Sequence, residues 1–156
     1  MKQNVQLILF GIEDKEFGIE AEMAREVISC GKITPVPTTP SIISGIISLR
    51  EYIIPIVAIN KKLCMNLKDD EKSTVLIVEW QGERVGLLVD SVKEIVDISC
   101  ASIESPSPML AFVNTNYLNG IGKLNDRIIF IVNMDNLLAE EVKKHQGTTV
   151  LVQTKS

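Results

Sequence analysis

The chain has few of the residues on which catalysis and metal binding usually depend. Aromatic residues make up 4% of its 156 residues, and histidine occurs once, at His145. Its cysteines, Cys30, Cys64 and Cys100, are odd in number and widely spaced, so they form neither a disulfide framework nor a metal motif. One histidine near the end of a predicted helix is most simply a surface residue, and no Ser-His-Asp arrangement is recognisable. We therefore predict no catalytic residues, no metal site and no cofactor.

Basic clusters and long apolar runs are also lacking. The formal net charge is −4, with 16 Lys and Arg against 20 Asp and Glu. Phosphate contacts need clustered basic residues, so we predict no nucleic-acid partner. No apolar run approaches the roughly 20 residues of a membrane-spanning helix, and no signal peptide is recognisable at the N-terminus. We expect a soluble, cytoplasmic protein with no direct membrane insertion.

The abundant residues are aliphatic. Hydrophobic residues make up 46% of the chain, and with so few aromatics the core must consist of Ile, Val and Leu. The β-branched members favour strands over helices. The length is sufficient for one domain with a sizeable core, whereas either half alone would be marginal. The two halves should therefore fold together across a shared interface.

An internal repeat is the strongest signal in the sequence. Seven pairs of identical residues lie 75 positions apart: Gly45/Gly120, Ile46/Ile121, Leu49/Leu124, Ile53/Ile128, Ile54/Ile129, Ile56/Ile131 and Val57/Val132. Upstream, at an offset of 68, Gly18 matches Gly86, Glu26 matches Glu94, and Val27-Ile28 matches Ile95-Val96. Two copies are too few for a solenoid or an array. We predict a mainly β chain that forms two similar small barrels, from residues 5–67 and 74–138, followed by a helix end and tail at 139–156.

Local patterns predict the elements of each copy. Residues 5–10 and 16–19 read as a hairpin, and residues 74–80 open the second copy with a turn at 81–83. Residues 40–47 look like a short helix, with Thr39 as N-cap and Pro40 at the first helical position. Residues 53–59 read as a strand, and Pro55 inside it indicates an edge or bulged position.

Three further segments complete the predicted fold. Residues 21–28 have helix-favouring composition, but their counterpart 89–96 alternates like a strand, and the repeat favours a strand for both. Residues 102–119 read as a long loop. Residues 136–145 are predicted as a C-terminal helix with Leu137 and Leu138 on one face.

The residues therefore favour binding over catalysis. Two barrels side by side create a groove that can receive a helix, and exposed strands can meet other β modules. The weak signal for chemistry is Cys64, because Lys61 and Lys62 lie near it in the sequence and a nearby cation lowers a thiol pKa. A small-molecule-binding β-barrel, or an enzyme that uses Cys64, remains an alternative.

Several stretches carry a resemblance to a known family, over nearly the whole chain from about Val5 to about Leu138. They are residues 17–19 with 26–28, 33–37 (Ile-Thr-Pro-Val-Pro), 45–50 with 53–56, 85–92 and 120–138. In this order they resemble CheW, the coupling protein of bacterial chemotaxis. The resemblance implies a single CheW-like domain over 1–156, with two five-stranded SH3-like β-barrels packed side by side, a short helix between the halves and a C-terminal helix.

The resemblance also implies a function and partners. It implies a non-enzymatic adaptor that couples chemoreceptor signalling tips to the regulatory domain of the histidine kinase CheA, in arrays at the membrane to which the cytoplasmic protein is recruited. A related scaffold serving a kinase pathway other than chemotaxis is an alternative.

By position, the resemblance assigns a receptor-binding groove and one assembly residue. The groove would contain Ile8, Ala21, Ala24, Val27 and Val92. For Val27 and Val92, plain core positions are the competing interpretation. Arg50 falls on the family's assembly and signalling arginine, and a weak surface ion pair is its competing interpretation.

The chain departs from the family pattern in two places. Glu51 replaces a glycine after the arginine, and Ala58 replaces an aspartate near the strand end. We expect the first change to alter the turn conformation. Together they bear on partner specificity rather than on the fold.

Overall fold

The computed structural model describes residues 3–35, 42–63, 65–67, 73–107 and 115–139, which are mainly β-strand. The strands are β1 (Asn4–Ile12), β2 (Lys15–Glu20), β3 (Ala24–Ser29), β4 (Ile43–Leu49), β5 (Tyr52–Val57), β6 (Thr74–Trp80), β7 (Glu83–Val89), β8 (Ser91–Ser99), β9 (Ile103–Glu104), β10 (Leu118–Leu124) and β11 (Arg127–Val132). The short helices are η1 (Ala21–Met23), α1 (Ile59–Lys62), η3 (Cys100–Ser102) and η4 (Thr115–Tyr117), and residues 134–139 are also helical.

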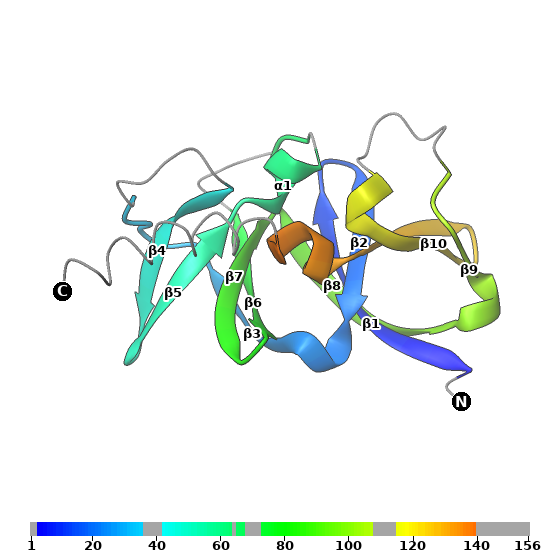
Figure 1. Cartoon of the computed structure of the whole chain (residues 1–156), viewed down its shortest axis with the longest axis horizontal. Coiled ribbons are helices and arrows are strands. Elements are labelled where there is room, and N and C mark those ends of the chain that lie inside the picture. Colours follow the sequence, from blue (N-terminus) through cyan, green and yellow to red (C-terminus); the bar gives the residue numbers. More distant parts are fainter. Residues whose placement is uncertain (1–2, 36–41, 64, 68–72, 108–114, 140–156) are drawn as a thin grey trace.

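The strands form two sheets that lie side by side (Figure 1). The six-stranded sheet has the order β8-β1-β2-β11-β10-β9 and makes the lobe that we call the β1 lobe. The five-stranded sheet has the order β3-β6-β7-β5-β4 and makes the β6 lobe. The chain leaving β8 forms β9 and pairs with β10, and the chain leaving β3 forms a bridge from Thr34 to Ile46 in β4. Each sheet therefore curls back on itself, which confirms the predicted pair of small barrels, with a sixth strand in one of them.

The two copies of the repeat are interleaved rather than separate. The hairpin β1–β2 of the first copy pairs with β8 and β11 of the second, whereas the hairpin β6–β7 of the second copy pairs with β3 and β5 of the first. Segments 5–67 and 74–138 thus each contribute strands to both sheets. Exchange of the two hairpins makes each lobe depend on both halves of the chain.

Buried apolar residues form three clusters. One fills the β6 lobe and includes Val75 and Ile77 of β6. Another fills the β1 lobe and includes Leu7 and Leu9 of β1. The third lies between the lobes and has more than twice as many buried residues as the other two combined; Phe17 is among its fully buried members. Because strand side chains alternate between two faces, β1 and β6 each supply one row to a lobe and one row to this interlobe core.

The glycines at the centre of the repeat lie where the chain closes each barrel. A Cβ added to Gly45 would lie 2.4 Å from the carbonyl oxygen of Thr34, and one added to Gly120 would lie 3.0 Å from that of Glu104. The equivalent crossing segment therefore approaches the backbone closely in both lobes. The match between Gly45 and Gly120 reflects this contact.

The helix predicted at residues 40–47 is wrong where the structure describes that segment. Ile43–Leu49 is strand β4, and residues 36–41 lie outside the described part. The run of β-branched isoleucines favours a strand, and the equivalent segment of the second copy is β10. The short helix between the halves occurs instead at α1, so the predicted strand 53–59 ends at Val57.

Of the two positions predicted for Pro55, the edge is wrong, whereas the β4–β5 pairing does shift register close by, between Ile43 and Gly45 opposite Val57 and Ile56. β5 lies between β4 and β7. In an antiparallel ladder, hydrogen-bonded and non-hydrogen-bonded residue pairs alternate, beginning here with the hydrogen-bonded pair Leu49↔Tyr52 beside the turn. Pro55 and Ile46 therefore form a non-hydrogen-bonded pair, and the nitrogen of Pro55 faces β7. β7 pairs with β5 only at Ile56 and Val57, so no hydrogen bond from Pro55 is needed there.

The remaining segments follow the predictions more closely. Residues 21–28 form η1 and then β3, in agreement with the strand that the repeat favours. The loop predicted at 102–119 contains β9 and η4, while residues 108–114 lie outside the described part. The C-terminal helix begins at residue 134, and residues 140–156, including His145, are outside the described part.

We expect Gly45→Ala to lower the free energy of unfolding by about 3 kcal/mol, because its methyl group meets the Thr34 carbonyl oxygen. Gly31→Ala is the matched control, since no atom lies within 4 Å of an added Cβ at that position. Urea unfolding followed by circular dichroism measures both. Equal stability of the two variants would contradict this account of barrel closure.

Candidate partner-binding surface

Arg50 ties the β4–β5 hairpin to β3. It lies in the turn between the strands with φ of 55°, and Nη1 and Nη2 donate to the two carboxylate oxygens of Glu26 at 3.0 and 2.9 Å. The Arg50 side chain is 62% exposed, compared with 26% for Glu26. The left-handed residue of this turn is therefore Arg50 itself, and among the described residues Glu51 is not one with positive φ.

The ion pair has a clear electrostatic effect. The hydrogen bond from Arg50 holds the pKa of Glu26 below its ordinary value, and the same bond raises the pKa of Arg50. Both groups thus stay charged across the physiological range. Solvent screening keeps the contribution of such an exposed pair to stability small, so Arg50 is available for a role other than holding the fold together.

The second copy has a corresponding ion pair that matching the two copies of the repeat in the sequence did not predict. Arg127 donates to Glu94 at 2.8 Å and to Glu16 at 2.5 and 3.0 Å. Glu94 is the repeat counterpart of Glu26, but the arginine stands two positions after Asn125, the counterpart of Arg50. The matched glutamates were the available signal, since an acidic residue present in both copies favours a cation near it in each lobe.

The residue that follows the turn of this hairpin makes a different kind of contact in each copy. Tyr52 occupies the position equivalent to Arg127, and the guanidinium of Arg84 lies 4.2 Å from the centroid of its ring. Arg84 in turn matches Glu16 at the offset of 68. A cation–π contact in the β6 lobe thus stands where the β1 lobe has an ion pair. The two lobes share a backbone arrangement but present different side chains at the surface.

Three of the predicted groove residues meet at the interlobe core. Ile8 of β1 is 6% exposed and belongs to that core. Ala24 of β3 and Val92 of β8 are half-buried and pack against it. We call the border between the two lobes the seam. Ile8 lies beneath the surface of the seam, and Ala24 and Val92 lie partly at its surface.

The other two predicted groove residues lie nearer to solvent. Val27 of β3 is 48% exposed, which excludes the core interpretation for this position. Ala21 is half-buried in η1, which lies beside β1. Further exposed apolar residues that sequence reasoning did not single out are Ile53, Ile95 and Ile128. Ile95 and Ile128 are the repeat counterparts of Val27 and Ile53, so the repeat itself was the signal for them.

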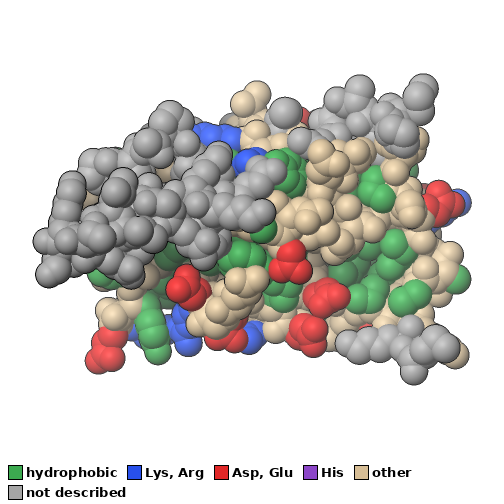
Figure 2. All heavy atoms as spheres, in the orientation of Figure 1, with side chains coloured by type: hydrophobic (Ala, Val, Ile, Leu, Met, Phe, Trp, Pro, Cys, Tyr) green, Lys and Arg blue, Asp and Glu red, His purple; other side chains and the backbone are tan. Residues whose placement is uncertain are grey.

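Figure 2 shows apolar side chains reaching the surface of the right-hand lobe, with acidic side chains beside them. Within the described residues there is no group of three His, Cys, Asp or Glu side chains placed to hold a metal ion, and no helix long and apolar enough to cross a membrane. Cys100 is exposed and Cys30 half-buried, while Cys64 lies outside the described part.

The arginine of the second copy gives a pH-dependent prediction. We expect Arg127→Met to lower the free energy of unfolding at pH 7 by about 1 kcal/mol, because it removes the hydrogen bonds to Glu16 and Glu94. The hydrogen bond from Arg127 holds the pKa of Glu16 below 4.5 in the folded protein. This carboxylate therefore stabilises the fold above pH 4.5, and its contribution disappears as the pH falls through the lowered pKa.

The difference between wild type and Arg127→Met should accordingly shrink at about pH 3. Urea unfolding at both pH values measures it. Arg25→Met, which removes an exposed ion pair to Glu79, is the control and should lower stability less at pH 7. A difference for Arg127→Met that stays constant with pH would rule out the ionised Glu16 as its origin.

Comparison with known proteins agrees with this geometry. The model of the CheW-like domain family matches residues 6–142. The chain is 28% identical to a chemotaxis protein CheW of Klebsiella aerogenes, over 87% of this chain and 82% of that protein. It is 29% identical to one of Helicobacter pylori, over 88% and 83%.

A solved structure is also similar. The scaffolding protein TtCheW from Thermoanaerobacter tengcongensis superposes with a TM-score of 0.77 and 32% identity, covering 88% of this chain and 90% of that one. The same two-lobed β architecture and a family match over most of the sequence lead to one conclusion: the chain belongs to the CheW family of chemotaxis coupling proteins.

Proposed function

We propose that this chain is a non-enzymatic adaptor that couples chemoreceptor signalling tips to the regulatory domain of the histidine kinase CheA. The observation that carries the proposal is the pair of adjacent residues on β3. Val27 leaves almost half of an apolar side chain in solvent, and Glu26 beside it is fixed by Arg50. The apolar contact point and the braced charged hairpin thus lie on opposite faces of the same edge strand.

The seam is suited to a helical partner. The small side chains of Ala21 and Ala24 allow close approach of a helix, and Val27 and Val92 offer apolar area to it, while Ile8 supports them from below. A receptor tip that presents an amphipathic helical hairpin would bury its apolar stripe here. Recruitment of the adaptor to membrane-associated arrays would follow from this contact.

The kinase contact would use the hairpins at the outer ends of the barrels. Arg50 at the tip of β4–β5 and the exposed Ile53 beside it suit contact with another β-barrel. Many weak interfaces of this kind can combine into an array through avidity. A binding assay with a purified receptor tip and a CheA regulatory domain, each alone and together, tests the proposal directly.

Val27→Lys should abolish binding of the receptor tip while leaving the fold intact, because the side chain is 48% exposed and its replacement buries no charge. We expect affinity to fall at least tenfold, the equivalent of about 1.4 kcal/mol. Ile128→Lys is the control; Ile128 is 57% exposed on β11, which pairs with β2 and β10 and not with β3. Circular dichroism checks folding, and unchanged receptor binding by a folded Val27→Lys protein would refute the groove.

Arg50→Ala should keep the fold and weaken array assembly or kinase control, since among the described residues it loses an exposed ion pair to Glu26, which contributes little to stability. Arg25→Ala also removes an exposed arginine–glutamate ion pair, the one between β3 and Glu79, and is expected to leave kinase control unchanged. Kinase activity in a system reconstituted from receptor, kinase and adaptor measures both variants. An unaltered kinase response with Arg50→Ala would exclude the assembly role.

A further inference from the structure

A groove on the β1 lobe combines apolar walls with an acidic border, and we call it the β1 groove. Its volume is about 330 Å³. Leu7, Ile103 and Ile131 line it, and each belongs to the core of this lobe or packs against that core. Glu20, at the end of β2, lines the same groove. Because Leu7 and Ile131 are buried whereas Glu20 is exposed, the β1 groove has an apolar floor and a carboxylate at its border.

Two acidic residues at this border have no cation partner in the described part of the chain. A hollow of about 120 Å³ adjoins the β1 groove, since Val5 and Glu20 line both, and Glu22 lines this hollow as well. Among the described residues, no lysine or arginine lines either space, and none forms an ion pair with Glu20 or Glu22. Arg25, the next cation in the sequence, is paired with Glu79 at 2.7 Å and reaches Glu22 at its backbone carbonyl rather than at its carboxylate. Figure 2 shows acidic side chains beside the apolar surface of this lobe, so a cation would complement the border.

The β1 groove is continuous with the seam. Met23, Val132 and Met134 line the groove, and they also belong to the interlobe core or pack against it. Met23 is the last residue of η1, the short helix that also contains Ala21, one of the residues of the predicted receptor site. A helix bound in the seam close to Ala21 would therefore pass the entrance of the β1 groove.

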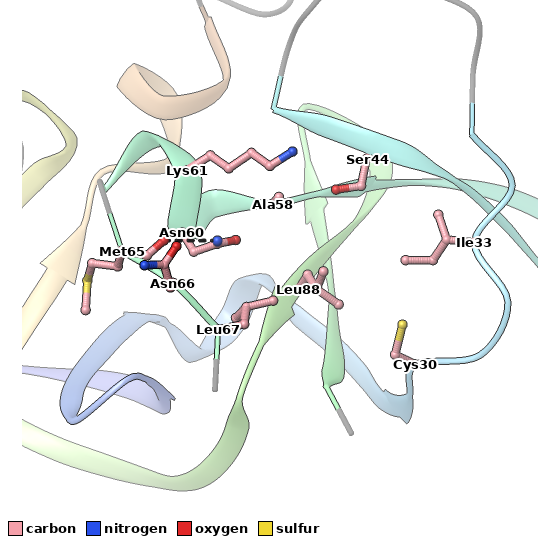
Figure 3. A pocket seen from close by; sticks show the side chains of 10 residues that line it. All are labelled: Cys30, Ile33, Ser44, Ala58, Asn60, Lys61, Met65, Asn66, Leu67 and Leu88. Carbon is pink, nitrogen blue, oxygen red and sulfur yellow. Dashed lines mark hydrogen bonds between the residues drawn. The ribbon is translucent and has the colours of Figure 1, made fainter. Parts of the chain in front are cut away.

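The equivalent cavity of the other lobe has the opposite charge. This cavity, of about 720 Å³ on the β6 lobe (Figure 3), has Leu88 at the position that matches Glu20 at the offset of 68. Lys61 is the only charged side chain among the described residues that line it, and Figure 3 shows this side chain extending from α1 along one side of the cavity. The acidic border is therefore a property of the β1 lobe, and the backbone that both copies share does not require it.

Apolar walls with an acidic border suit a lysine or arginine side chain, because such a side chain has an apolar stem and a cationic end. We propose that the β1 groove takes up a lysine or arginine side chain of the receptor helix that binds in the seam, with the cation beside Glu20 and Glu22. Complementary charge of this kind selects between partners. The inference rests on the proposed receptor contact and adds the chemistry of the partner, which is a basic residue next to the apolar stripe of the helix.

A double-mutant cycle between the full chain and a purified receptor tip tests this contact. Each lysine and arginine of the tip is replaced singly by glutamine, and every tip variant is titrated by calorimetry into wild type and into Glu20→Gln. We expect Glu20→Gln to weaken binding of the tip about fivefold at low salt, which is the effect of a partly exposed ion pair. One basic residue of the tip should lose its own contribution in the Glu20→Gln background, and this coupling should shrink at about 0.5 M NaCl because salt screens the pair.

Matched variants separate the groove from a general effect of charge or of bulk. Asp126→Asn removes an exposed carboxylate from the turn between β10 and β11 and should leave binding unchanged. Asn119→Phe fills the β1 groove without a change of charge and should weaken binding of the tip. Ser44→Phe, at the equivalent position of the cavity on the β6 lobe, should leave binding unchanged. Circular dichroism checks that each variant is folded.

The failure of this inference can be told apart from the failure of the adaptor role. If no basic residue of the tip couples to Glu20, or if Glu20→Gln and Asp126→Asn have equal effects, the groove contact is overturned while receptor binding stands. Equal effects of Asn119→Phe and Ser44→Phe in folded proteins would also overturn the groove contact. A receptor tip that does not bind the wild-type chain at all would overturn the adaptor role and this inference together.

Discussion

β1 and β6 each have to cover two apolar faces at once, and the rest of the architecture depends on this constraint. A small barrel of about 70 residues buries too little surface to be stable alone. Here each hairpin presents one row of side chains to its own lobe and the other to the core between the lobes. Fully burying a side chain such as Phe10 or Phe17 contributes about 1.5–3 kcal/mol, and the interlobe core contains more such residues than either barrel. The lobes are thus two parts of one cooperative unit.

Exchange of the hairpins strengthens this dependence. Neither copy of the repeat can complete a barrel, because β1 and β2 pair with β8 and β11 while β6 and β7 pair with β3 and β5. A chain built in this way holds its two lobes in a fixed relation through the interlobe core. Such a relation suits the separate contacts proposed for the seam and for the hairpins.

The repeat preserves the backbone and allows the side chains to diverge. The close approach at Gly45 and Gly120 is maintained in both lobes. The glutamates Glu26 and Glu94 are also kept, yet their arginines come from different positions of the hairpin. The equivalent positions Asn60 and Asp135 differ in whether the protein itself supplies a donor. A duplicated backbone thus carries two different sets of side-chain contacts.

The sequence by itself determined the strand-rich class, the internal duplication, the hairpin at Thr74–Val89 and the position of Arg50, because these depend on local pattern and on comparison of one copy with the other. It misplaced a helix at residues 40–47, where local capping signals outweighed the β-branched run, and an edge strand at Pro55, whose partners are distant in the chain. Only the tertiary structure decided that the hairpins are exchanged, that Val27 is exposed while Ile8 is buried, and that Arg127 faces Glu16. Strand pairing and burial depend on contacts between segments up to 111 residues apart. The alternation of side chains along one strand shows that the strand has two faces, but it does not show which face is covered by another segment of the chain.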